Sequence, residues 1–87
     1  ASAQRRQQLA PLKKTMQDAE KRVEKLTAAL ARLDELLADP NLYVEPQRAQ
    51  KTTLERGQAA KHLAEAEEAW LIATAAYEEA EMQEMSM

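Results

Sequence analysis

Apolar residues recur at alternating steps of three and four along the first half of the chain. Residues at this spacing form one narrow stripe on an α-helix, which is stable in water only when a second helix covers it. The pattern predicts a long helix over about residues 3–38. The nine apolar positions of its stripe, which we call a seam, are Leu9, Leu12, Met16, Ala19, Val23, Leu26, Leu30, Leu33 and Leu37.

The covering helix is supplied by the same chain. Asp39 stands before Pro40, and a residue before proline is disfavoured in a helix. Pro46 suits the first position of a new helix, where its missing N–H costs nothing. We therefore expect a turn over 39–45, a second helix over about 46–84, and an all-α fold, a two-helix antiparallel coiled-coil hairpin. The second seam is Ala59, Leu63, Ala66, Trp70, Ala73, Tyr77 and Ala80.

Folding the chain back at the turn gives a register in which the numbers of facing residues sum to about 89. Opposite charges then lie side by side. Residues 1–25 carry seven basic and three acidic side chains, whereas residues 63–87 carry seven acidic and no basic ones. The balance between the two segments disfavours a parallel or slipped register. The expected facing pairs are Leu12 with Tyr77, Ala19 with Trp70, Leu26 with Leu63 and Leu33 with Leu54.

Two residues interrupt the helical pattern. Pro11 is tolerated only near the start of a helix, so it either lies inside the first helix or marks its true first turn, with residues 5–10 frayed or in a linker. Gly57 lies inside the second helix at a cost of about 1 kcal/mol relative to Ala. We expect Gly57 to permit a close approach of the two helices.

Composition limits the possible functions. The chain has 87 residues, no cysteine, one glycine and a net charge of −3. We expect one domain, belonging to a larger protein because the chain begins without Met, with no membrane partner and a cytoplasmic location. His62 has no second His or Cys to complete a metal site, and Gly57 alone makes no phosphate loop. The glutamates of the second helix have no cleft, so we expect no catalysis and no cofactor in this chain.

Two groups of residues are candidates for binding nucleic acid. Basic doublets recur every eight residues, a spacing that we expect to drift only modestly around the helix and to offer a ladder for phosphates; the alternative is a solvated face neutralised by the acidic second helix. In the turn, Tyr43 stands near two basic residues and is a candidate for base stacking; the alternative is that Leu42 or Tyr43 packs back on the hairpin end. The candidates are Arg5, Arg6, Lys13, Lys14, Lys21, Arg22, Tyr43, Arg48 and Lys51.

Three apolar residues fall off the seams. Leu71 and Ile72 follow Trp70, and Leu36 precedes the seam residue Leu37. Two helices cannot bury all of them, and adjacent exposed apolar residues mark docking surfaces. The partner is expected to be a second copy, giving a homodimer, or the rest of the parent protein.

One stretch resembles a known family. The segment Leu36-Leu37-Ala38-Asp39-Pro40-Asn41-Leu42-Tyr43, a helix begun by proline, and Glu67-Glu68-Ala69-Trp70-Leu71 resemble the C-terminal coiled-coil domain of ABC-F ATPases, most of all the YheS/Uup-like group. In that family a leucine heptad helix ends in an LxDPxLY turn, and the returning helix carries an acidic stretch and a Trp. This chain departs from the family at Glu45, where Asp is commoner, and in its Ala-rich sequence after Trp70.

The resemblance implies a non-catalytic arm about 50 Å long on a soluble ATP-binding protein that acts on ribosomes in translation. ATP and Mg²⁺ would bind upstream, outside this chain. The arm would contact ribosomal RNA, tRNA or DNA, or dock on the ATPase core of its parent. Two alternatives stay open. One is the tRNA-binding C-terminal arm of a valyl-tRNA synthetase, and the other is a structural or dimerising hairpin that binds no nucleic acid.

Overall fold

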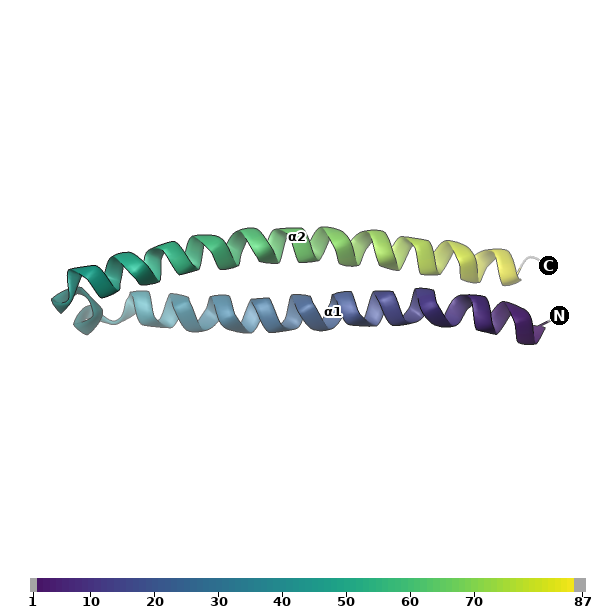
Figure 1. Ribbon diagram of the computed structural model, residues 1–87, viewed down its shortest axis with the longest axis horizontal. Helices are drawn as coiled ribbons and strands as arrows, with labels where there is room; N and C mark the ends of the chain where they lie inside the picture. The colour runs from purple at the N-terminus through teal and green to yellow at the C-terminus, as the bar shows by residue number, and fades with distance from the viewer. Residues whose placement is uncertain (1, 86–87) are drawn as a thin grey trace.

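The computed structural model describes the backbone of residues 2–85 and the side chains of residues 6–85. It contains two long helices, α1 (Ser2–Ala38) and α2 (Pro46–Met85), joined by the short 3₁₀ helix η1 (Pro40–Val44). The helices run side by side in opposite directions, so both ends of the chain lie at the same end of the rod (Figure 1). The predicted all-α antiparallel hairpin is confirmed.

Burial follows the two predicted seams. All nine seam residues of α1 and all seven of α2 are at least partly shielded from solvent, whereas most of their neighbours along the chain are exposed. The α2 seam also extends toward the turn through Ala49, Thr52 and Arg56. Because two of these three residues are polar, the apolar pattern of the sequence begins ten residues later, at Ala59.

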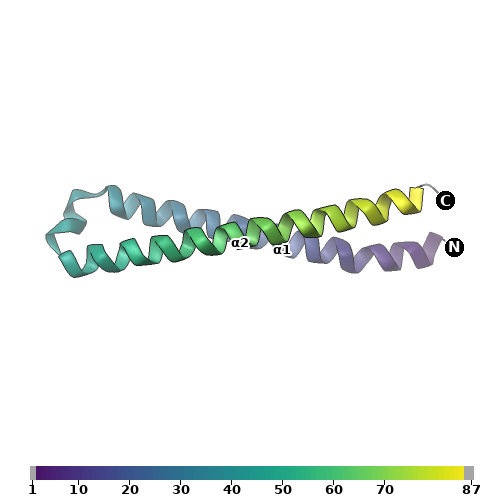
Figure 2. The ribbon, with the colours of Figure 1, turned by 90° about the horizontal axis from the view of Figure 1, so that it is seen from above.

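The rod measures 65 × 15 × 15 Å, longer than the expected 50 Å because α2 alone has 40 residues. Seen from above, the two helices cross in projection and diverge toward both ends (Figure 2). A heptad repeat is shorter than two turns of a straight helix, so helices that keep their seams together wrap around each other. We call the closed end (34–56) the tip, and the open end (6–25 with 63–85) the base.

The turn is built by local hydrogen bonds. Asp39 adopts an extended backbone, and its carboxylate accepts a hydrogen bond from the Asn41 N–H at 2.9 Å. The Leu42 N–H then donates to the Asp39 carbonyl at 3.1 Å, which closes the 3₁₀ turn. Leu42 is only 5% exposed, so it is the residue that packs back on the hairpin end. The Glu45 carbonyl accepts from the Ala49 N–H at 3.1 Å and opens α2.

The structure bears on three expectations about single residues: those for Leu54 and Gly57 are wrong, and the choice left open for Pro11 is settled. Leu54 is 64% exposed and does not lie on the seam; the register places Arg56 opposite Leu33 instead. Gly57 is exposed, and a Cβ placed there meets nothing within 4 Å, so it permits no close helix approach. Pro11 lies inside α1, which begins at Ser2, so it does not mark the first turn.

The core between the helices is thin. Among residues 6–85 the buried ones are Leu42, Ala49, Thr52 and Ala66, and three of these four lie at the tip. Within the described side chains, no large residue is fully buried. Small residues on α2 face larger ones on α1 along most of the seam, which lets the helices lie close together, and Trp70 over Ala19 reverses the pattern once.

Candidate nucleic-acid and docking surfaces

The basic residues of α1 are exposed along the base. The side chain of Arg5 lies outside the described residues. Among the described side chains, Lys14 pairs with Asp18 of its own helix at 3.6 Å, and the other basic residues of the doublets form no ion pair with a carboxylate. The acidic side chains of α2 therefore do not neutralise them by direct contact. These basic residues are Arg6, Lys13, Lys14, Lys21 and Arg22.

The doublets do not form a straight ladder. At 3.6 residues per turn, a step of eight residues advances by two turns and about 80°. In a heptad lettered a to g with Leu9 at position a, Arg6 and Lys13 lie at e, Lys14 and Lys21 at f, and Arg22 at g. The expectation of a modest drift was wrong, because two steps carry the basic side chains from one side of the seam across the outer surface to the other.

The acidic residues of α2 face solvent over most of their length. Glu65, Glu67, Glu68, Glu78 and Glu79 are all exposed, and Glu79 lines an open hollow with Met82, Gln83 and Met85. Tyr77 is different because it lies on the seam near the open end. A hydrogen bond to the Glu81 carboxylate raises the pKa of Tyr77, and partial desolvation and the charges of Glu81 and Glu84 raise it further.

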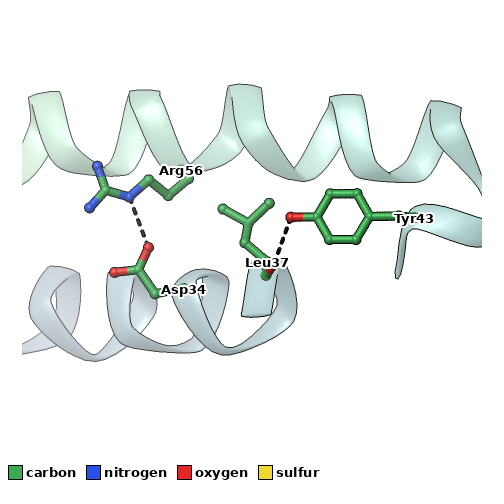
Figure 3. Close-up of polar contacts among 4 residues, drawn as sticks. All are labelled: Asp34, Leu37, Tyr43 and Arg56. Carbon is green, nitrogen blue, oxygen red and sulfur yellow. Dashed lines mark hydrogen bonds and ion pairs between the residues drawn. The ribbon is translucent and has the colours of Figure 1, made fainter. Parts of the chain in front are cut away.

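The tip holds Tyr43 in a fixed position. Its hydroxyl donates a hydrogen bond of 2.6 Å to the Leu37 carbonyl, one of the carbonyls left without a helical partner at the end of α1 (Figure 3). The side chain is nevertheless 56% exposed. Leu42 therefore packs inward and Tyr43 caps α1 while its ring still presents surface to solvent, and base stacking on this ring stays a prediction.

The two basic residues near Tyr43 differ. Arg48 lies 3.9 Å from the Glu45 carboxylate in an exposed pair, beside a shallow hollow formed with Pro46 and Gln47. Lys51 is exposed and has no ion pair with a described carboxylate. An exposed pair such as Arg48–Glu45 is weak and opens readily to an incoming phosphate. The tip therefore has a rigid aromatic surface with one free and one loosely held cation.

One ion pair joins the two helices at the tip. The Arg56 Nε donates to the Asp34 Oδ1 at 2.9 Å, and this hydrogen bond and the Asp34 charge raise the pKa of Arg56 (Figure 3). Arg56 lies on the α2 seam, so its aliphatic stem packs against the helix interface while its head reaches the carboxylate. The contact is compatible with the register of the seam and adds a weak polar link at this layer.

The three apolar residues that lie off the seams do not lie together. Ile72 lines an apolar groove between the helices, together with Leu12, Thr15, Ala69, Ala73 and Ala76. Leu71 is 62% exposed but does not line this groove. Leu36 is only 37% exposed, and the register places it level with about residue 53, roughly 27 Å along the rod from Leu71. The three residues therefore do not form one patch.

His62 is exposed, as expected for a surface histidine. Across the described residues, no three His, Asp or Glu side chains gather closely enough to hold a metal ion. Over the same residues, neither helix contains a stretch apolar enough to cross a membrane. Comparison of the chain with protein-family models, with curated proteins and with solved structures found no match.

Proposed function

We propose that the hairpin is a rigid, non-catalytic arm of an ABC-F ATP-binding protein and that it contacts structured RNA through the basic side chains of α1. The observation that carries the proposal is the absence, among the described side chains, of any ion pair between these residues and the carboxylates of α2. Cations that are not held by α2 bind phosphate at a small cost, because only counterions and, for Lys14, the weak exposed pair with Asp18 have to be released.

The shape of the molecule supports this role. A rod 65 Å long with both chain ends at one end extends its tip away from whatever the ends are joined to. ATP and Mg²⁺ would be bound by the parent protein, outside this chain. The ABC-F part of the proposal rests on the LxDPxLY-like turn around Asp39 and Pro40 and on the position of Trp70.

Binding is tested by titrating the chain with a structured RNA and with duplex DNA at low and high salt. Replacing Lys13, Lys14, Lys21 and Arg22 by Ala should abolish measurable RNA binding at moderate salt and lower the slope of log K against log salt by about 3. A control variant with Arg32→Ala and Lys61→Ala removes two exposed cations elsewhere and should bind almost as the native chain does. No binding of either nucleic acid at low salt would refute the proposal.

A contact at the tip is the second candidate, favoured by the exposed ring of Tyr43 and the free cation of Lys51. The double variant Tyr43→Leu with Lys51→Ala distinguishes it from the first. If this variant loses RNA binding and the α1 variant keeps it, the contact lies at the tip. Stacking on an aromatic ring contributes about 1–3 kcal/mol per base, so a loss of tenfold or more is expected in that case.

The gene that encodes the chain tests the family part separately. Two ATP-binding domains with P-loops encoded together with the hairpin would support the ABC-F proposal. A synthetase catalytic domain there would contradict it and would point to tRNA as the ligand. The RNA titration tests the contact with RNA, and the encoding gene tests the family. Either part of the proposal can therefore be refuted without the other.

A further inference from the structure

The base has two chemically different sides. Positions g and c of both helices lie on one side of the rod, and positions e and b lie on the other. In α2, where Ala49 is at position a, Ile72 lies at c and Ala69 and Ala76 at g, whereas Leu71 lies at b. The groove and Ile72 therefore share one side of the rod, and Leu71 is on the opposite side.

The groove on the g side is lined almost entirely by small and apolar side chains. Ala69, Ala73 and Ala76 of α2 lie across from Leu12 and Thr15 of α1. These small residues leave a hollow between the helices, and Ile72 stands at its edge with 64% of its surface exposed. A hollow and an exposed apolar side chain thus lie next to each other on a single surface.

The protruding side chain and the hollow also lie at the same height along the rod. With facing residues summing to 89, Ile72 is level with residue 17 of α1, and the groove spans the levels of residues 12–20. A twofold interface brings the same patch of two copies together, so it requires a surface that is complementary to itself. A copy related by a twofold axis along the groove places its Ile72 over α1 at this height, beside Thr15 at the edge of the hollow.

We propose that the g side of the base docks a second copy of this chain to form a parallel, twofold-symmetric pair of hairpins. Charge selects the parallel arrangement. With the axis along the rod, α1 of one copy lies over α2 of the other, which brings Arg22 and Lys25 level with the second copy's Glu65. An antiparallel arrangement centred on Ile72 would lay α2 over α2 and bring Glu65 level with Glu79 of the second copy, both at position c of the same side.

The exposed surface is large enough for such a pair. The chain exposes 6804 Å², against about 5,200 Å² for a compact monomer of its mass. A standard interface buries about 1,600 Å² in total, half from each partner. A dimer of this kind therefore uses only part of the excess surface and leaves the e and f positions of α1 free. The inference does not depend on the proposed contact with RNA.

Sedimentation velocity tests the surface, because Ile72 and Leu71 are adjacent, equally exposed and on opposite sides. Between about 10 μM and about 1 mM, the range in which a modest interface dissociates, the native chain should pass from monomer to dimer. Ile72→Glu should weaken dimerisation at least tenfold, whereas Leu71→Glu should leave it within about twofold. Circular dichroism should show that both variants stay helical.

Three sedimentation results would overturn the proposal. A native chain that stays monomeric over this whole concentration range would show that the groove does not bind a second copy. Equal weakening by both variants would place the interface elsewhere, as would dimerisation unaffected by Ile72→Glu.

The distance between the two tips tests the arrangement. The chain has no cysteine, so Asn41→Cys provides a single site for a spin label at the tip. Parallel rods 15 Å thick hold the two labels within roughly 30 Å of each other. An antiparallel pair centred on the groove separates them by about 70 Å, which would contradict the charge argument.

Discussion

The tip and the base of the hairpin are held together by different interactions. At the tip, Leu42, Ala49 and Thr52 are buried, and polar contacts tie the elements to one another: Tyr43 to the end of α1 and Arg56 to Asp34. In the base, the hydrogen bonds and ion pairs among residues 6–25 and 63–81 stay within one helix. Over these residues the two helices are joined by the apolar seam.

This difference separates the part that fixes the structure from the part that is available to partners. The tip buries Leu42, Ala49 and Thr52 and ties its elements together by polar contacts, although Val44 and Leu54 are exposed there. Among the described side chains, the base has exposed cations on α1 that form no ion pair with α2, exposed carboxylates on α2 and an open groove between the helices. The base therefore offers both charged and apolar surface to a partner, and a partner that binds there has to break few existing contacts.

Replacing Leu42 by Ala should have the largest effect, because it removes the most buried large side chain of the tip. We expect a loss of about 3 kcal/mol in the free energy of unfolding, measured by urea denaturation. Val44→Ala, at a residue that is 77% exposed in the same turn, is the matched control and should change stability by less than about 0.5 kcal/mol. Equal effects would mean that the tip is not a packed unit.

Pro11→Ala tests the continuity of α1 through the base. Pro11 removes a backbone hydrogen bond inside the helix, so Ala should stabilise the hairpin by about 2 kcal/mol, somewhat less than the full interior penalty of about 3 because only a short segment precedes it. The free energy of unfolding measures the gain. An unchanged value would show that residues before Pro11 do not belong to the stable helix.

Gly57→Ala examines the border between the tip and the middle of the rod. A methyl group at Gly57 meets nothing within 4 Å, and the backbone there is helical. We expect a gain of about 1 kcal/mol from helix propensity, visible as a higher urea midpoint. A loss of stability would indicate that the helices approach at Gly57 after all.

The smallest effect concerns pH and the open end. Because the folded-state pKa of Tyr77 is raised, its contribution to stability is fully present below the unfolded pKa of about 10 and is lost as pH rises through the higher folded value. Urea midpoints of the native chain should therefore fall above about pH 10. Tyr77→Phe should reduce this alkaline decline, and an identical decline in both chains would contradict the assignment.

The sequence predicted the hairpin, its turn and the seam residues because these depend on a regular apolar spacing. It missed the tip end of the α2 seam, since Thr52 and Arg56 lie on the helix interface but are polar. Leu54 was placed there in their stead because it is apolar, although the heptad puts it on the outer face. Apolar character alone therefore misleads where polar side chains occupy a seam.

The candidate surfaces were predicted less completely. The exposure of Leu71 and Ile72 followed from their place off the seam, but adjacent residues point about 100° apart on a helix, so only Ile72 shares a side with the groove. The eight-residue spacing of the basic doublets likewise predicted a nearly straight ladder, but the doublets wind around α1. The dual role of Tyr43 required the turn's actual geometry, since no sequence pattern shows that its hydroxyl reaches Leu37.

The most direct test of the central claim is site-resolved amide hydrogen exchange on dilute and on concentrated samples. The account predicts slow exchange over residues 37–52 at both concentrations, and faster exchange over 12–15 and 69–76 that slows as concentration rises. This result would show a tip that is complete in itself and a base that is completed by a second copy. Protection in the base that equals that of the tip when dilute, or that stays the same at both concentrations, would contradict it.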